Sequence, residues 1–196
     1  MGTLTSGPLS ELALVLSKKF GIRDFVETGT FRGETTRWAA GRFEHVTTVE
    51  MNEQFYREAC ASLGDLPNVR VLHGDSVTVL KETIAALTGP ALFWLDAHSG
   101  GGFFAAEDYC PLIGELQAIN ASPLQHVILI DDARAFLAPP PPPFKPEKWP
   151  GLSEVILTLN ARFPTYTICL GDAIIATPLA AQNLLNQFSA LVRPKI

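Results

Sequence analysis

Hydrophobic and polar positions divide the chain into two kinds of segment. Short, almost uninterrupted apolar runs are typical of strands buried on both faces of a sheet. Longer segments with an apolar residue every three or four positions are typical of amphipathic helices. The predicted strands are residues 23–27, 45–50, 69–72, 91–95, 126–130, 166–170 and 173–177. The predicted helices are residues 8–20, 34–43, 52–63, 77–88, 111–119, 152–163 and 184–191.

Strands and helices alternate through five units before two consecutive strands and a closing helix. Parallel strands need such helical crossovers, whereas the short turn at Gly171 and Asp172 makes the last two strands antiparallel. The pattern predicts an α/β fold with a doubly wound, mostly parallel seven-stranded sheet. One strand near the C-terminus is antiparallel, and helices cover both faces. Residues 1–196 are expected to form a single domain, with an N-terminal helix within residues 1–22.

Composition and charge narrow the function classes. The chain has 196 residues, of which 47% are hydrophobic and 18% charged, so a folded core is expected. A net charge of −5 argues against binding to nucleic acid or to anionic membranes. The three cysteines are far apart and form no Cys-x-x-Cys pair, which excludes a disulfide framework and favours a cytoplasmic setting. No apolar run reaches membrane-spanning length, and no signal-peptide core is expected at the N-terminus.

A glycine-rich turn follows the first predicted strand. The strand ends in Glu27, Gly29 and Gly33 follow at a spacing of four, and a helix begins at Glu34. Such a turn exposes backbone N–H groups and lets a ligand approach the main chain. Its place in the fold is that of a nucleotide-type cofactor site. The spacing differs from the dinucleotide fingerprint Gly-x-Gly-x-x-Gly, and tight packing alone is the alternative.

Acidic residues stand at the carboxyl ends of successive predicted strands. In a parallel sheet these ends share one edge, where ligands bind. Glu50 lies about 20 residues after the glycine turn, where an acid binds ribose hydroxyls in nucleotide-binding folds. Asp75 and Ser76 are placed to meet the base of the same ligand, although Asp75 can instead cap the following helix. The acids are Glu27, Glu50, Asp75, Asp96, Asp131 and Asp132.

Asp96, Asp131 and Asp132 form a second acidic cluster, after the fourth and fifth strands. Carboxylates this close need a compensating cation, and oxygen ligands suit Mg²⁺, which can activate a substrate hydroxyl. The alternative is that Asp132 caps a helix, Asp131 bonds locally and no metal binds. His98 is either a general base or a solvent-facing loop residue. Arg134 either holds an anionic substrate or, as we expect, pairs with the aspartates.

Together these motifs resemble the S-adenosylmethionine-dependent methyltransferase family with a Rossmann-like fold. The resemblance is narrower to the metal-dependent O-methyltransferases of the catechol and caffeoyl-coenzyme A type and to relatives that act on antibiotic sugars. It covers roughly residues 25–134. The family motifs match Glu27, Gly29, Phe31, Gly33 and Thr35 in the glycine turn, Glu50 at the ribose, Gly74, Asp75 and Ser76 at the adenine, and Asp96, Asp131 and Asp132 at the metal.

The resemblance implies methyl transfer from S-adenosylmethionine to a hydroxyl oxygen of a small molecule. It implies that Mg²⁺ or a similar cation binds Asp96, Asp131 and Asp132. The catalytic residues are expected to be Asp96 and His98, the latter because it lies two residues beyond Asp96. A homodimer is left open. The implied cofactor-binding residues are Glu27, Gly29, Thr30, Phe31, Gly33, Thr35, Glu50, Asp75, Ser76 and Asp96.

The chain departs from the family after the fourth strand. The catechol-type enzymes carry a lysine shortly after the acid, whereas this chain has Ala97, His98 and Ser99, so the base and the substrate stay open. Loops 97–110 and 137–151 flank the predicted site and are expected to shape the substrate pocket.

Two alternatives remain from the sequence. One is a metal-independent methyltransferase acting on nitrogen or a carboxylate. The other is a non-catalytic binding protein with a vestigial cofactor site, in which the prolines at 139–143 dock an aromatic-grooved partner.

Overall fold

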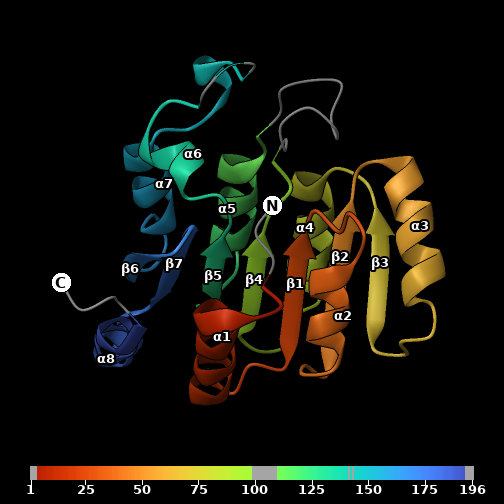
Figure 1. The fold of residues 1–196 in the computed structure, drawn as a ribbon, viewed down its shortest axis with the longest axis horizontal. Coiled ribbons are helices and arrows are strands. Elements are labelled where there is room, and N and C mark those ends of the chain that lie inside the picture. The colour runs from red at the N-terminus through yellow and green to blue at the C-terminus, as the bar shows by residue number, and fades with distance from the viewer. Residues whose placement is uncertain (1–3, 99–109, 141, 143, 193–196) are drawn as a thin grey trace.

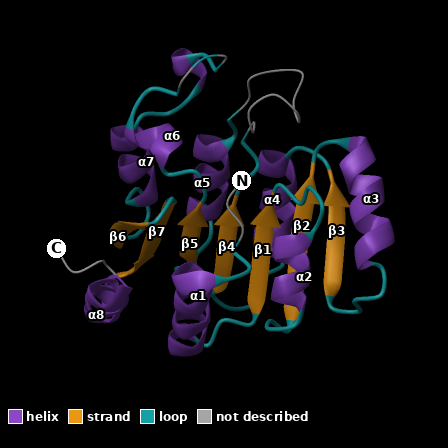
Figure 2. Ribbon diagram, in the orientation of Figure 1, coloured by secondary structure: helices purple, strands orange, loops and turns teal. Residues whose placement is uncertain are grey.

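Seven strands form one sheet between two layers of helices in the computed structural model, which describes residues 4–98, 110–140, 142 and 144–192 (Figures 1 and 2). The strands are β1 (Asp24–Thr28), β2 (His45–Glu50), β3 (Val69–His73), β4 (Ala91–Leu95), β5 (Val127–Ile130), β6 (Thr165–Leu170) and β7 (Ala173–Pro178). The helices are α1 (Gly7–Phe20), α2 (Glu34–Ala40), α3 (Glu53–Leu63), α4 (Ser76–Ala85), α5 (Leu112–Asn120), α6 (Arg134–Leu137), α7 (Leu152–Leu159) and α8 (Gln182–Val192), with 3-10 turns η1 (Pro146–Lys148) and η2 (Leu179–Ala181).

The strand order is β3-β2-β1-β4-β5-β7-β6, and β1 to β5 run parallel to one another. β7 lies antiparallel to both of its neighbours, β5 and β6. The predicted seven-stranded sheet with one antiparallel strand is therefore confirmed. The order reverses between β1 and β4, and ligands bind beside such a reversal in open α/β sheets.

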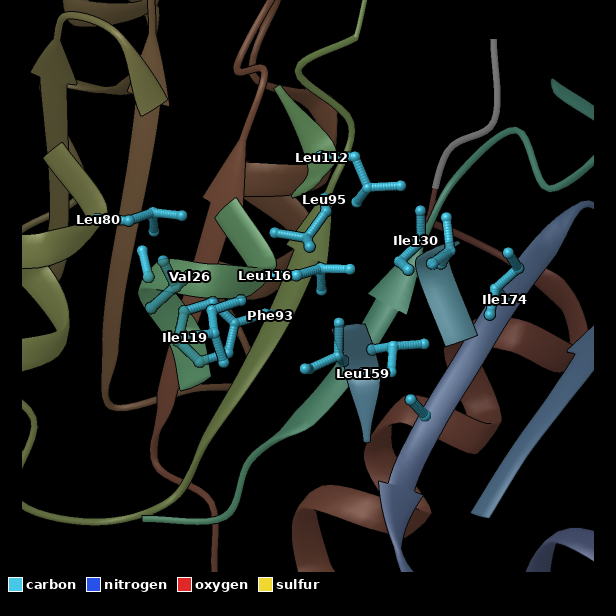
Figure 3. Packing of buried hydrophobic residues seen from close by; sticks show 14 of the residues in the cluster. Val26, Leu80, Phe93, Leu95, Leu112, Leu116, Ile119, Ile130, Leu159 and Ile174 are labelled. Atoms are coloured by element: carbon cyan, nitrogen blue, oxygen red, sulfur yellow. The ribbon is translucent and has the colours of Figure 1, made fainter. Parts of the chain in front are cut away.

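β4 is the centre of the core. All five of its residues are buried, as its uninterrupted apolar sequence predicts. Phe93 and Leu95 pack into the hydrophobic cluster that includes side chains of α4, α5 and α7 (Figure 3). Leu92 and Trp94 point to the opposite face, where α1, α2 and α8 pack. Helices thus cover both faces of the sheet, and the acidic side chains of the predicted site lie at the carboxyl ends of its strands.

Three short elements were not predicted, and three helices end earlier than predicted, since α2 ends at Ala40 in place of residue 43 and α4 at Ala85 in place of residue 88. α6, η1 and η2 have only three or four residues each, which is too short for a helical repeat to show in the sequence. α7 ends at Leu159, earlier than the predicted residue 163. The cause is Asn160, whose side chain accepts the backbone N–H of Thr165 and directs the chain into β6. None of the helices in the described part of the chain has the length and apolarity that a membrane span requires.

Candidate active site

The glycine turn and the acids of β1, β2, β4 and β5 lie at the edge where the strand arrowheads point in Figure 1. Gly29 has φ +85° and donates its N–H to the Val49 carbonyl at 2.9 Å. A Cβ at residue 29 would lie 2.2 Å from the carbonyl oxygen of Asp96. A Cβ at Gly33, φ +74°, would meet the Leu63 side chain at 2.9 Å. Position 29 therefore requires glycine because its clash is with backbone, whereas position 33 favours glycine because of its positive φ and the nearby Leu63 side chain, and the turn fits closely between β2, β4 and α3.

Phe31 is the strained residue of this turn. Its φ is +48°, a region that costs a non-glycine residue about 1–3 kcal/mol. Two contacts hold it there. The backbone N–H of Phe31 donates to Glu50 Oε2 at 2.9 Å, and its ring meets that of Phe55 edge-on with centroids 4.9 Å apart. Such strain clusters at ligand-binding sites, which agrees with the predicted role of the turn.

Glu27 is fully buried beneath the turn. The hydroxyls of Thr36 and Thr48 both donate to its Oε2, the latter at 2.8 Å. Thr30 and Thr48 share a further hydroxyl hydrogen bond of 2.6 Å. Burial raises the pKa of Glu27 to about 7, although both hydrogen bonds act in the opposite direction. The carboxyl therefore titrates near neutral pH, unlike an exposed glutamate. Of the two adjacent threonines of α2, it is Thr36 that donates to Glu27, so the cofactor contact predicted for Thr35 stays a prediction.

Glu50 uses both carboxylate oxygens to order the backbone around it. Oε2 accepts from Phe31, as above, and Oε1 accepts the N–H of Asn52 at 2.8 Å. Each carboxylate oxygen has a second lone pair, so the same side chain can accept from two vicinal hydroxyl groups. The geometry fits a ribose at the predicted position.

Asp75 caps α4, which is the alternative that its sequence position left open. Its Oδ2 accepts the N–H of Thr78 at 3.0 Å and the Thr78 hydroxyl at 2.9 Å. Ser76 is buried at the start of the helix. Binding of the cofactor base by Asp75 and Ser76 therefore remains a prediction. Asp75 already caps α4, and Ser76 is already buried in the fold.

Glu115, in the first turn of α5, is a candidate that the sequence analysis missed. It is 1% exposed, and burial raises its pKa, while the neighbouring Ser76 and Thr28 hydroxyls act in the opposite direction. Its Oε1 has no hydrogen-bond partner among the described residues. The sequence does contain a signal for this residue, because a glutamate at position 115 interrupts the apolar stripe that Leu112 and Leu116 form on the buried side of α5.

His98 lies at the centre of the second cluster. Its Nε2 is 3.2 Å from Asp132 Oδ2 and 4.0 Å from Asp96 Oδ1. The imidazole meets the rings of Phe136 and Trp149 edge-on, at centroid distances of 5.8 and 5.5 Å. Its side chain is only 4% exposed. The structure therefore excludes the alternative of a solvent-facing loop residue and places His98 where a base or a metal ligand would act.

Asp96, His98 and Asp132 can each offer one ligand atom to a common point, because these atoms all lie within 4.8 Å of one another. Burial, followed by the charges of Asp131 and Asp132, raises the pKa of Asp96 well above its usual value. Asp131 is buried beside this group, with its pKa raised by burial and with Oδ2 lacking a hydrogen-bond partner in the described part of the chain. The structure thus brings His98 together with Asp96 and Asp132 at the possible cation position, whereas Asp131, the third predicted ligand, is not part of this set of donor atoms.

Asp132 is held from two sides. His98 and Arg134 both lower its pKa, the hydrogen bond from His98 having the larger effect. Arg134 Nη2 contacts Asp132 Oδ1 at 2.6 Å, and Arg134 Nη1 contacts Asp172 Oδ2 at 2.6 Å. The expected pairing of Arg134 with an aspartate is confirmed. Like Phe31, Asp132 has a positive φ, +49°.

The two predicted flanking loops are only partly described. Residues 99–109 of the first loop and residues 141 and 143 of the second lie outside the described residues, so the roles assigned to these loops and to the proline run stay predictions. The described end of the second loop reaches the site, since Trp149 packs on His98 and Phe136.

Comparison with known proteins agrees with this architecture at the level of the fold. No family model and no curated protein sequence matches the chain. Solved structures do match, and among them is the O-methyltransferase TomG of Streptomyces achromogenes, involved in tomaymycin synthesis and solved with SAM. It is 18% identical over 88% of this chain and 81% of its own, with a TM-score of 0.62. An O-methyltransferase from Bacillus cereus, solved with SAH, is 17% identical over the same shares of the two chains, with a TM-score of 0.63.

CalS10, an amino pentose methyltransferase from Micromonospora echinaspora involved in calicheamicin biosynthesis, is 13% identical over 86% of this chain and 89% of its own, with a TM-score of 0.55 and SAM bound. Identities this low establish shared architecture and leave chemistry to the site residues. The chain therefore has the Rossmann-like fold of the S-adenosylmethionine-dependent O-methyltransferases.

Proposed function

We propose that the protein is an S-adenosylmethionine-dependent methyltransferase that methylates a hydroxyl oxygen of a small molecule. The observation that carries the proposal is the direct contact between the two halves of the site. The main chain of Gly29, in the cofactor-type turn, lies against the carbonyl of Asp96, the first residue of the acidic cluster. A cofactor in the turn would thus present its reactive end to the cluster. The relatives of like fold that were solved with SAM or SAH support this assignment.

The chain offers a partner for each part of the cofactor. Glu27 would receive the ammonium group of the methionine end, and the turn from Gly29 to Gly33 would pack along the same part. Glu50 can accept from the ribose hydroxyls with the lone pairs that Phe31 and Asn52 leave over. The remaining proposed contacts are made by Thr30, Thr35, Asp75, Ser76 and Asp96.

His98 is the proposed base. S-adenosylmethionine, consumed as a substrate, supplies an electrophilic methyl group. The acceptor hydroxyl gives its proton to a ring nitrogen of His98 as the oxygen bonds to the methyl carbon, and the methyl carbon–sulfur bond breaks to release S-adenosylhomocysteine. Asp132, bonded to Nε2 of the same ring, orients the imidazole and stabilises its charged form. The rings of Phe136 and Trp149 exclude water from one side of His98, which strengthens this polar contact.

A divalent cation at Asp96, His98 and Asp132 is a second form of the proposal, in which His98 would be a ligand of the ion and would no longer act as the base. The donor atoms fit by type and spacing, and a cation would relieve the repulsion that raises the pKa of Asp96. A set of one imidazole and two carboxylates suits first-row ions such as Mn²⁺ better than Mg²⁺. Such an ion would lower the pKa of a bound hydroxyl, and His98 would then act as its ligand.

A metal-independent methyltransferase is the alternative, and one observation favours it. Asp132 already has His98 on one oxygen and Arg134 on the other, so its charge is balanced by the protein itself. The imidazole is then free to act as the base.

Calorimetry with S-adenosylmethionine and S-adenosylhomocysteine tests the cofactor assignment. Wild type should bind both, and Glu50→Ala should bind them about 10–100-fold more weakly, since each lost charge-assisted hydrogen bond is worth ~1.5–3 kcal/mol. Glu53→Ala is the matched control, because Glu53 is an exposed acid three residues further on whose side chain pairs with Arg57. Equal affinities in both variants would refute the ribose assignment. No binding by wild type would refute the proposed function.

Transfer of labelled methyl groups to a panel of catechols and amino sugars tests the reaction. Product formation that requires Mn²⁺ or Mg²⁺, and a cation affinity that Asp96→Asn abolishes, would support the metal. Asp65→Asn, which changes an exposed acid of the same charge, is the control. Methyl transfer that persists in the presence of a metal chelator would support the metal-independent alternative. Cofactor binding with no transfer to any acceptor would favour the vestigial site.

A further inference from the structure

We propose that Asp172, on the turn between β6 and β7, is a positioning residue that fixes Asp132 and, through Asp132, His98. This role rests on the proposed function, in which His98 is the base and Asp132 orients its ring. The contacts that carry it stand independently of any cofactor or substrate.

Arg134 is the link between the turn and the site. Its Nη1 contacts Asp172 Oδ2 and its Nη2 contacts Asp132 Oδ1, both at 2.6 Å. Its backbone N–H also donates to Asp172 Oδ1 at 3.1 Å. Asp172 therefore holds both the main chain and the side chain of Arg134, and the guanidinium is directed at Asp132. A guanidinium presents its donors in a rigid plane, so a fixed Nη1 also fixes the direction of Nη2.

Asp132 transmits this constraint to His98. Its carboxylate is planar, and Oδ1 is bonded to Arg134 while Oδ2 faces His98 Nε2 at 3.2 Å. Holding Oδ1 therefore determines where Oδ2 points. The backbone is constrained by the same turn, since the N–H of Ala133 donates to the Asp172 carbonyl at 2.8 Å. This contact adjoins the positive φ of Asp132, a conformation that needs support from its surroundings.

A role in stability alone accounts poorly for these contacts. The Arg134 side chain is 68% exposed, and ion pairs in water contribute little to the stability of a fold. The orientation of the His98 ring is more sensitive to these contacts than the stability of the fold is. Without Asp172, Arg134 loses the partner on one side, Asp132 loses its fixed Oδ1, and the imidazole loses the acceptor that selects its orientation.

The test is a measurement of the His98 ring in Asp172→Asn and Arg134→Gln. Long-range ¹H–¹⁵N correlation spectra of labelled protein report which ring nitrogen of each of the four histidines carries the proton. His98→Gln identifies the His98 signals. In both variants we expect the His98 nitrogen signals to move toward the average of the two tautomers, while the other three histidines keep their positions. Glu44→Gln, which removes an exposed carboxylate paired with Arg23, is the matched control and should leave all four unchanged.

Crystal structures of wild type and Asp172→Asn give a second measure through the His98 Nε2 to Asp132 Oδ2 distance, here 3.2 Å. A distance that lengthens beyond hydrogen-bonding range would support the proposal. Unchanged His98 signals and an unchanged distance would overturn it, and with a lowered unfolding temperature they would leave Asp172 as an anchor of the hairpin. None of these readouts needs a cofactor. A protein that fails to bind S-adenosylmethionine would refute the proposed function and still answer this question.

Discussion

The main chain of Gly29 touches the carbonyl group of Asp96, so that a Cβ at residue 29 would fall 2.2 Å from the carbonyl oxygen and 3.1 Å from the Cα of Ala97. The contact joins the turn after β1 to the end of β4, the two strands between which the sheet order reverses. The spacing of the glycines is thus determined by backbone approach at the site as well as by the turn itself.

Gly29→Ala should therefore lower the free energy of unfolding by about 2–4 kcal/mol, through the backbone clash and through the positive φ. Gly21→Ala is the matched control. Gly21 has φ +62° with nothing within 4 Å of its Cβ position, so that this variant should lose only about 1–2 kcal/mol. Urea unfolding measures both. Equal losses would show that the contact with Asp96 relaxes freely.

Glu27 should make the protein less stable as the pH rises toward neutrality. Its pKa is raised from 4.5 to about 7 in the folded state, so between these values the unfolded chain releases a proton that the folded chain keeps. Stability is full below pH 4.5 and is lost as the pH rises through about 7, by up to ~3 kcal/mol. Glu27→Gln should unfold with a higher free energy at pH 8 and with little change near pH 4.5.

The same variant should bind S-adenosylmethionine more weakly, because the amide cannot pair with the ammonium group. Calorimetry and urea unfolding on one preparation separate the two effects. A Glu27→Gln protein that is less stable at pH 8 would contradict the raised pKa. Full cofactor affinity would contradict the proposed contact.

His126 should oppose Glu27 on the acid side. It is buried at the start of β5, where Nδ1 accepts the N–H of Ala91 at 3.1 Å and Nε2 contacts the Ser122 hydroxyl at 2.9 Å. Burial lowers its pKa from 6.5 to about 4, so the neutral ring stabilises the fold above pH 6.5 and this contribution is lost as the pH falls through about 4.

His126→Gln should therefore remove the rise of unfolding free energy with pH between 4 and 6.5, a contribution of up to ~3 kcal/mol, and leave the opposing fall from Glu27 unmasked. In wild type the two contributions should nearly cancel between pH 4.5 and 6.5, where their ranges overlap, so the stability maximum should be broad and lie there. Ser122→Ala, which keeps the imidazole, should retain the dependence. An unchanged pH profile in His126→Gln would show that this histidine does not titrate with unfolding.

His98→Gln should abolish methyl transfer while cofactor affinity is kept. Loss of a general base costs about 10²–10⁴-fold in rate, and His98 lies in the acidic cluster, apart from the proposed ribose and methionine contacts. His45→Gln is the control, since His45 is exposed and pairs with Asp24 away from the site. Rates with labelled S-adenosylmethionine check the first claim and calorimetry the second. Undiminished transfer in His98→Gln would exclude His98 as the base.

The fold was predictable because its signals are local. A buried strand such as β4 has to be apolar throughout, and an acid at a strand end marks the same sheet edge every time. The predicted helix start at residue 52 is also local, since Asn52 caps α3 by accepting the backbone N–H groups of Gln54 and Phe55. Short polar or proline-rich segments show no helical repeat of apolar residues, and α6 and η1 were not predicted for that reason.

Residues of the site that depend on tertiary contacts could not be read in the same way. Sequence position does not distinguish the hydroxyls of Thr35 and Thr36. Only the orientation of α2 in the fold brings the Thr36 hydroxyl to Glu27. Arg134 and Asp172 are 38 residues apart, and no local pattern links them. Asp75 could be read as a cap or as a ligand, and the structure shows the cap.

The place of β7 has a consequence for how the protein matures. A ribosome delivers β1 to β5, with the glycine turn and all six acids of the strand ends, before the hairpin of β6 and β7 is made. β7 must then insert beside β5, and only its arrival brings Asp172 to Arg134. The proposed cofactor-binding turn can thus form early on the nascent chain, whereas the proposed catalytic centre is completed by the last strands to be synthesised.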